Sequence, residues 1–134
     1  PVGVQRLREV YDRVKHILKE RMQKTFIVKN SDGVYRFQYD DIFYFYSDRR
    51  LVNLVTVRGI YPFYEKLDVL EEKLGNSFVR IHQRYLVNGK KVLHIGRTSL
   101  DILGQDRQLQ TLPISRALKE TASAKLARMM LADG

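Results

Sequence analysis

Residues 4–23 carry apolar side chains at the three- and four-residue spacing of an amphipathic helix. No Gly or Pro interrupts this segment, and cationic side chains cover its other faces. The apolar stripe can pack on the rest of the chain as a linker helix, or it can join two copies as a short coiled coil. We expect residues 1–24 to form this linker or dimerisation helix and residues 25–134 to form one folded domain. The stripe consists of Val4, Leu7, Tyr11, Val14 and Leu18.

From residue 25 to residue 112 the pattern changes to short apolar runs that are separated by turn residues, which is typical of β-strands. The run 42–46 is continuously apolar and aromatic, which favours a strand buried on both faces. The alternative is that these rings form a platform on which the bases of single-stranded nucleic acid stack. Strands are predicted at 25–29, 34–39, 42–46, 51–57, 60–63, 78–81, 85–87, 92–95, 99–103 and 108–112.

Two further helices are predicted, one inside the β region and one after it. The first lies within residues 65–74, and Gly75 supplies its end. After Pro113, Ser115 is typical of a helix N-cap, and the closing helix is predicted to run to about residue 131. The fold is therefore predicted to be mainly β, with one short internal helix and a helix at each end. The apolar stripes of these two helices are Leu67, Leu70 and Leu74, and Leu118, Ala122, Leu126 and Met129.

The chain of 134 residues lacks cysteine, which excludes disulfides, thiolate metal sites and a cysteine nucleophile. Its three histidines show no ligand spacing, and no Gly-rich phosphate loop or nucleophile elbow is present. The adjacent acids at 40–41 and 71–72 point in different directions along their elements. We therefore expect no enzyme activity, no cofactor and no metal. No apolar run approaches the roughly 20 residues that cross a bilayer, so we expect no membrane segment.

A net charge of +9 indicates an anionic partner, with nucleic acid favoured over a membrane surface or an acidic protein. Several cations fall in predicted turns, from which a guanidinium can reach guanine O6 and N7 in a DNA groove. A glutamine can pair in the same way with adenine. For any single arginine the alternative is a solvated surface cation, or one stacked on an aromatic ring. The candidates for DNA binding are Arg49, Arg50, Gln83, Arg84, Arg116 and Lys119.

Four segments resemble the LytTR family of DNA-binding domains in their order and spacing, over about residues 25–120. The resemblance implies an elongated, mainly β domain of a cytoplasmic bacterial transcription regulator, whose loops enter successive major grooves on one face of bent double-stranded DNA. Members usually bind promoter repeats as output domains of two-component response regulators. The segments are YDDIFYFYSDRR at 39–50, FYEKLDVLEEKL at 63–74, FVRIHQRYLVN at 78–88 and LPISRALK at 112–119.

The resemblance also implies the role of each candidate. Arg50, with Arg49 beside it, reads bases after the aromatic strand, and Arg116 reads bases from the turn into the last helix, in its predicted first turn. Lys119 is placed for a phosphate, while His82 and Asn88 match structural positions. Gln83 and Arg84 form the middle contact set, but here the cation stands one position later than in many relatives. In an extended segment such a shift moves a side chain to the opposite face, which leaves the base-facing residue of the pair open.

The chain starts at Pro1 without an initiator Met, so we expect a receiver or sensor domain to precede it in a longer protein. The residues 4–23 would then be the linker to that domain and a candidate homodimer contact. The alternative function, from another class, is a non-enzymatic interaction or oligomerisation module that uses this helix and the basic surface.

Overall fold

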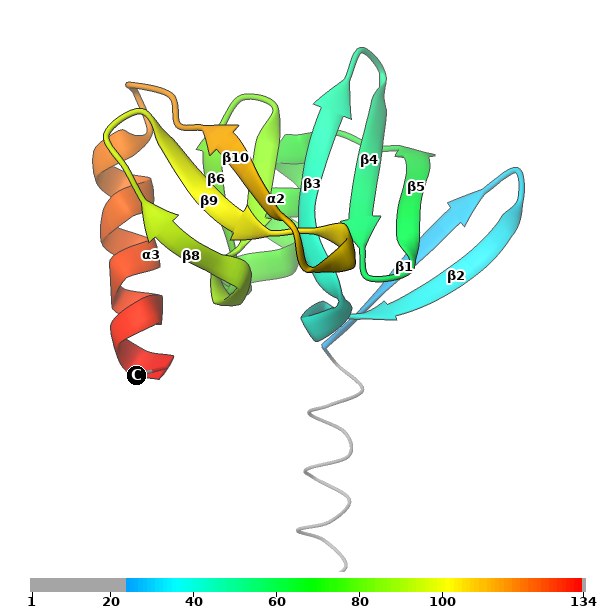
Figure 1. Cartoon of the computed structure of the whole chain (residues 1–134). Helices are drawn as coiled ribbons and strands as arrows, with labels where there is room; N and C mark the ends of the chain where they lie inside the picture. Colours follow the sequence, from blue (N-terminus) through cyan, green and yellow to red (C-terminus); the bar gives the residue numbers. More distant parts are fainter. Residues whose placement is uncertain (1–23, 134) are drawn as a thin grey trace, which may run out of the picture.

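The computed structural model describes residues 24–133, which form three antiparallel sheets and two α-helices (Figure 1). The predicted mainly β fold is confirmed, whereas the helix predicted at 4–23 lies outside the described residues. The strands are β1 (Thr25–Asn30), β2 (Gly33–Gln38), β3 (Ile42–Asp48), β4 (Leu51–Thr56), β5 (Gly59–Tyr64), β6 (Phe78–His82), β7 (Tyr85–Asn88), β8 (Val92–Ile95), β9 (Ser99–Leu103) and β10 (Leu109–Pro113), and the helices are α2 (Leu67–Leu74) and α3 (Lys119–Asp133).

A five-stranded sheet with the order β5-β4-β3-β7-β6 forms the middle layer. The β1–β2 hairpin and α2 pack on one of its faces, around one cluster of buried apolar side chains. The three-stranded sheet, of order β10-β9-β8, and α3 pack on the other face around a second cluster. Each cluster draws side chains from strands of the five-stranded sheet, so this sheet forms the wall between two cores.

The aromatic strand β3 is buried on both sides, as predicted from its continuous apolar run. Ile42 and Phe45 belong to the first core, and Phe43 and Tyr44 belong to the second. The register with β4 shifts between Ile42 and Tyr44, and this bulge lets two consecutive side chains face the same core. The interpretation of this run as a base-stacking platform is wrong, because Phe43, Tyr44 and Phe45 are all buried.

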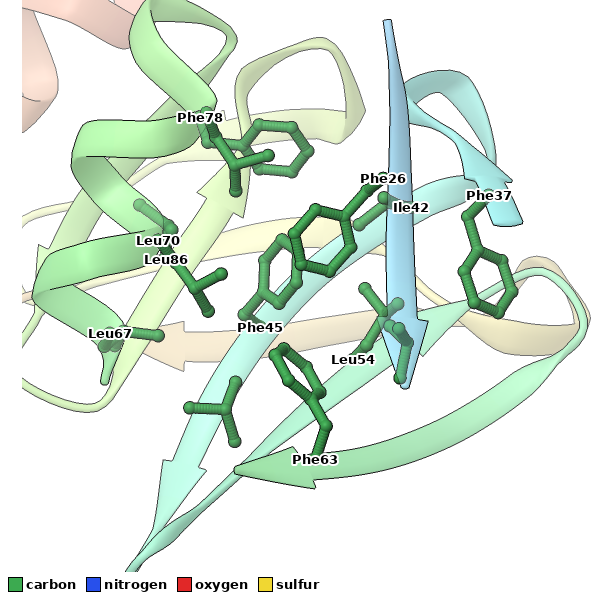
Figure 2. Close-up of a cluster of buried hydrophobic side chains, with 13 residues drawn as sticks. Phe26, Phe37, Ile42, Phe45, Leu54, Phe63, Leu67, Leu70, Phe78 and Leu86 are labelled. Carbon is green, nitrogen blue, oxygen red and sulfur yellow. The ribbon is translucent and has the colours of Figure 1, made fainter. Parts of the chain in front are cut away.

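Aromatic rings and leucines fill the first core together (Figure 2). The rings of Phe26 and Phe45 meet edge to face at 5.3 Å between centroids, an arrangement that aromatic pairs prefer. The predicted stripe of α2 is confirmed, since Leu67, Leu70 and Leu74 are all buried. The helix ends at Gly75, whose φ of 68° lies in the left-handed region that glycine adopts without strain.

The start of α3 differs from the prediction. Ser115 does not cap the helix, because its Oγ is buried without a hydrogen-bond partner in the described structure and α3 begins only at Lys119. Two backbone bonds tie the segment before the helix to other turns, from the Ile114 N–H to the Thr98 carbonyl (2.9 Å) and from the Ser115 N–H to the Ile81 carbonyl (2.8 Å). A turn closed by the bond from the Leu118 N–H to the Ser115 carbonyl (3.2 Å) then leads into α3.

Candidate nucleic-acid interface

The β3–β4 hairpin closes with a turn of two residues, Arg49 and Arg50, because the strands pair as far as Asp48 and Leu51. The sequence predicted a longer turn over 47–50. Both arginines are exposed, and Arg49 has a φ of 59°. A side chain in this left-handed region is sterically disfavoured, so the turn is adopted at a conformational cost.

The β6–β7 hairpin closes in the same way with Gln83 and Arg84, since His82 pairs with Tyr85. Both side chains are exposed at the turn. The expected alternation of faces does not apply, because the two residues lie in a turn and not in an extended strand. His82 accepts a hydrogen bond at Nδ1 from the Arg84 N–H at 3.1 Å, and it therefore holds the loop, as the resemblance implies.

Arg116 is exposed in the turn before α3, and Lys119 is the half-buried first residue of that helix. The sequence placed both in the first helical turn. Lys119 thus stands at the positive end of the helix dipole, where a cation is disfavoured and an anionic ligand is favoured.

Backbone hydrogen bonds join these turns in series. The Ser47 N–H donates to the Arg84 carbonyl at 2.9 Å, at the base of the first two turns. The bonds of Ser115 to Ile81 and of Ile114 to Thr98 continue the series to the segment before α3 and to the β8–β9 turn. We call the four turns, residues 49–50, 83–84, 96–98 and 114–118, the loop edge. They share one end of the molecule, at the top of the view in Figure 1.

Arg97 is a cation of the loop edge that the sequence analysis did not single out. It is exposed in the β8–β9 turn, which the Gly96 N–H closes by donating to the Ser99 carbonyl at 2.8 Å. The signal was the Gly-Arg pair between two predicted strands. The sequence alone does not place this turn beside the other three, because the bond between Thr98 and Ile114 links residues that are distant in sequence.

The cations of the loop edge, and Lys119 beside it at the start of α3, make no ion pair within residues 24–133, so their charge is available to a ligand. Other arginines are engaged internally. The guanidinium of Arg58 lies 4.5 Å from the centroid of the Phe37 ring and donates to the Arg36 carbonyl at 2.9 Å. The stacked alternative is therefore correct for Arg58, at the other end of the sheet. The available cations are Arg49, Arg50, Arg84, Arg97, Arg116 and Lys119.

Asn88 has a structural role, as the resemblance implies. It is 2% exposed, and its Nδ2 donates to the carbonyls of Tyr39 (3.0 Å) and Ile42 (2.8 Å). Its Oδ1 accepts from the Lys90 N–H at 3.1 Å. These three bonds tie the end of β7 to the start of β3, at the opposite end of the sheet from the loop edge.

The described residues contain no group of three His, Cys, Asp or Glu side chains that could hold a metal ion. A hollow of about 350 Å³ is lined by Tyr44, Tyr46 and Tyr85 among others. Burial raises the pKa of Tyr44, with smaller contributions from the other two tyrosines, so this phenol stays protonated at neutral pH. No helix in residues 24–133 is long and apolar enough to span a membrane.

A mainly β domain with cations free of ion pairs on one edge of loops has a surface suited to an anionic partner such as nucleic acid. Residues 32–127 match the profile of the LytTr DNA-binding domain, and the chain belongs to this family. It is thus a DNA-binding domain for transcription regulation, and the family is not one of enzymes.

One solved structure with this fold is described as the LytTr DNA-binding domain of a methyl-accepting/DNA response regulator from Bacillus cereus. It aligns with a TM-score of 0.58 and 13% identity, over 80% of this chain and 96% of that one. At this identity the likeness supports the fold. No functionally curated protein matches the sequence.

Proposed function

We propose that this domain reads the sequence of duplex DNA with the turns of its loop edge, which enter successive major grooves. The observation that carries the proposal is the series of backbone bonds that holds four turns with unpaired cations in one row. The series sets an order, in which the Arg49–Arg50 turn lies on one side, the Gln83–Arg84 turn in the middle and the segment around Arg116 on the other side.

The chemistry of each residue suggests its contact. Arg50 and Arg116 can pair bidentately with guanine, and Gln83 can pair with adenine. Phosphate contacts position a protein without reading sequence, and they supply much of the affinity. We assign Arg49, Arg84, Arg97 and Lys119 to this role.

The spacing of the turns favours a bent DNA in the complex. Strands lie about 4.8 Å apart, so the two hairpin turns are separated by about 10 Å of backbone, and the whole reading row spans under about 20 Å. Successive major grooves on one face of straight DNA are about 34 Å apart. Bending toward the protein brings them closer and gives sequence preference at base pairs that the protein does not touch.

The testing experiment selects random duplexes by binding and then measures competition by nonspecific DNA for the wild type and for Arg116→Ala. We expect the wild type to enrich a motif. At one position of this motif, Arg116→Ala should lose about 1–3 kcal/mol of the binding free energy that discriminates between bases. Arg128→Ala removes the same charge from an exposed position late in α3 and should leave the motif intact. Binding without a motif, and equal in the two variants, would contradict base reading.

A salt series gives a second test. The four cations assigned to phosphates, if each neutralises one, predict a slope of log K against log salt of about −4. Binding that does not weaken between low and moderate salt would contradict the proposal.

We propose in addition that the domain is the output part of a response regulator, downstream of a receiver domain, and that residues 4–23 carry a homodimer contact. The support is the family and the heptad stripe in the sequence. Gel filtration with and without residues 1–23 tests the contact. A dimer lost on truncation, together with retained DNA binding, is expected. An unchanged oligomeric state on truncation would contradict the contact, and a dimer that binds no DNA with or without residues 1–23 would favour the interaction module.

A further inference from the structure

Arg80 on β6 is a cation close to the loop edge whose side chain is turned inward and is only 13% exposed. One guanidinium makes four hydrogen bonds. Its Nε donates to the His82 carbonyl (2.7 Å) and one terminal nitrogen donates to the Gln83 carbonyl (2.6 Å). The other terminal nitrogen donates to Asp68 (2.7 Å) and Glu71 (3.2 Å) on α2.

The two carbonyl bonds fix the main chain of the middle turn. They add to the bond from the Arg84 N–H to His82 and to the bond from the Ser47 N–H to the Arg84 carbonyl. The register between β6 and β7 shifts between Arg80 and His82, and a bulge of this kind redirects the side chains around it. The backbone of the turn is therefore held from three sides, while the side chains of Gln83 and Arg84 project freely.

The carboxylates of α2 orient the guanidinium and contribute little to stability. Asp68 and Glu71 stand three residues apart, so both face Arg80 from neighbouring positions on the helix. Their side chains are 86% and 45% exposed, and ion pairs this open to water contribute little free energy. What they supply is direction, because a planar guanidinium can satisfy two carbonyls and two carboxylates only in one orientation.

A direct role for Arg80 at the DNA is disfavoured by the same bonds. A guanidinium has five N–H groups, and four hydrogen bonds are already made inside the protein. One N–H remains, so the bidentate pairing that reads a guanine would require one of these four bonds to break.

We infer that Arg80 is a positioning residue for sequence reading, which anchors the Gln83–Arg84 turn to α2 so that Gln83 meets a base edge in one fixed geometry. The inference rests on the proposed function and deepens it. Preorganisation of this kind improves discrimination, because a mobile side chain can satisfy several bases about equally well.

The test uses Arg80→Lys, which keeps the positive charge and loses the planar guanidinium with its several N–H donors. Gln83→Ala first identifies the base position that the middle turn reads, as the position where selection by the variant becomes flat. We expect Arg80→Lys to reduce the preference at that same position by about tenfold and to leave the other positions of the motif unchanged. In the free protein, the backbone order parameters of Gln83 and Arg84 should fall from about 0.85 to below about 0.6.

Arg58→Lys is the matched control. It disturbs an arginine that also bonds a backbone carbonyl, but at the far end of the sheet. A loss of stability alone would appear in both variants, whereas flattening at the position of Gln83 should appear only in Arg80→Lys.

Should Arg80→Lys unfold the domain, the double variant Asp68→Asn, Glu71→Gln loosens only the anchor on α2. Glu72→Gln removes one negative charge at an exposed neighbouring position. Twice its effect on DNA binding is the electrostatic reference for the double variant. We expect a flattening of about threefold at the same position.

The outcomes separate the two proposals. A motif that responds to Gln83→Ala but not to the Arg80 variants, with an ordered turn, overturns the positioning role and leaves the proposed function standing. A wild type that selects no motif overturns both, even where the order parameters fall.

Discussion

Arg49 occupies a backbone conformation that its side chain disfavours, with a φ of 59° in a two-residue hairpin turn. A left-handed residue other than glycine costs roughly 1–2 kcal/mol, which glycine avoids at the expense of about 0.5–1 kcal/mol of entropy. Arg49→Gly should therefore leave the free energy of unfolding unchanged or raise it by up to about 1 kcal/mol, while weakening DNA binding. Urea unfolding and gel shifts measure the two effects.

The neighbouring Arg50 provides the control for this prediction. Its φ is not positive, so Arg50→Gly gains no relief and should lose about 0.5–1 kcal/mol of stability. Equal destabilisation by the two glycines would show that the turn stores no strain at Arg49.

Asn88 is a residue whose loss should harm folding without touching recognition. Asn88→Ala leaves two carbonyls and one N–H without their partner in a buried site, which predicts a loss of about 2–4 kcal/mol in the free energy of unfolding. Chemical denaturation measures it, with Asn76→Ala at an exposed position as the control. The selected DNA motif should stay the same under conditions where the variant is folded, and a changed motif would contradict the structural role.

At the scale of elements, α3 begins with a cation at the end of the helix where the dipole disfavours it. Lys119→Gln should raise the free energy of unfolding by about 0.3–1 kcal/mol. The same substitution should weaken DNA binding and reduce the magnitude of the salt slope by about 1. Denaturation and a salt titration of binding check the two opposite effects.

Lys125→Gln removes an equal charge from an exposed position in the middle of α3. It should change neither quantity appreciably. A Lys119 variant that behaves like this control would show that the helix start takes no part in phosphate binding.

At the scale of the whole molecule, the row of turns is shorter than the repeat of straight DNA, so we expect a bend in the complex. A circular-permutation gel assay should detect it for the wild type. Arg116→Ala removes a contact at one end of the row and should reduce the bend angle, whereas Gln83→Ala removes a contact in the middle and should preserve it. Wild-type complexes that migrate as straight DNA would contradict this geometry.

The sequence predicted the strands and turns well, because these depend on local patterns. The buried strand β3 followed from its continuous apolar run, and the end of α2 followed from Gly75. The start of α3 could not be predicted, since Ser115 is held by a bond to Ile81, 34 residues earlier in the chain. The candidate DNA contacts were found as separate turns and through the family. Arg97, and the inward orientation of Arg80, depend on contacts between distant segments that no local pattern encodes.

The wall between the two cores has a consequence for how this protein can evolve. Arg50 is carried by the middle sheet, and Arg116 follows the strand β10 of the other sheet, so the distance between them depends both on the bond from Ser115 to Ile81 and on how the two sheets pack around Tyr44, Leu100 and Ile102. Under the proposed function, the packing between the two sheets therefore contributes to the spacing of the base contacts. On that proposal, substitutions in the second core would change the spacing of the bases that the domain prefers while the side chains of the loop edge stay the same.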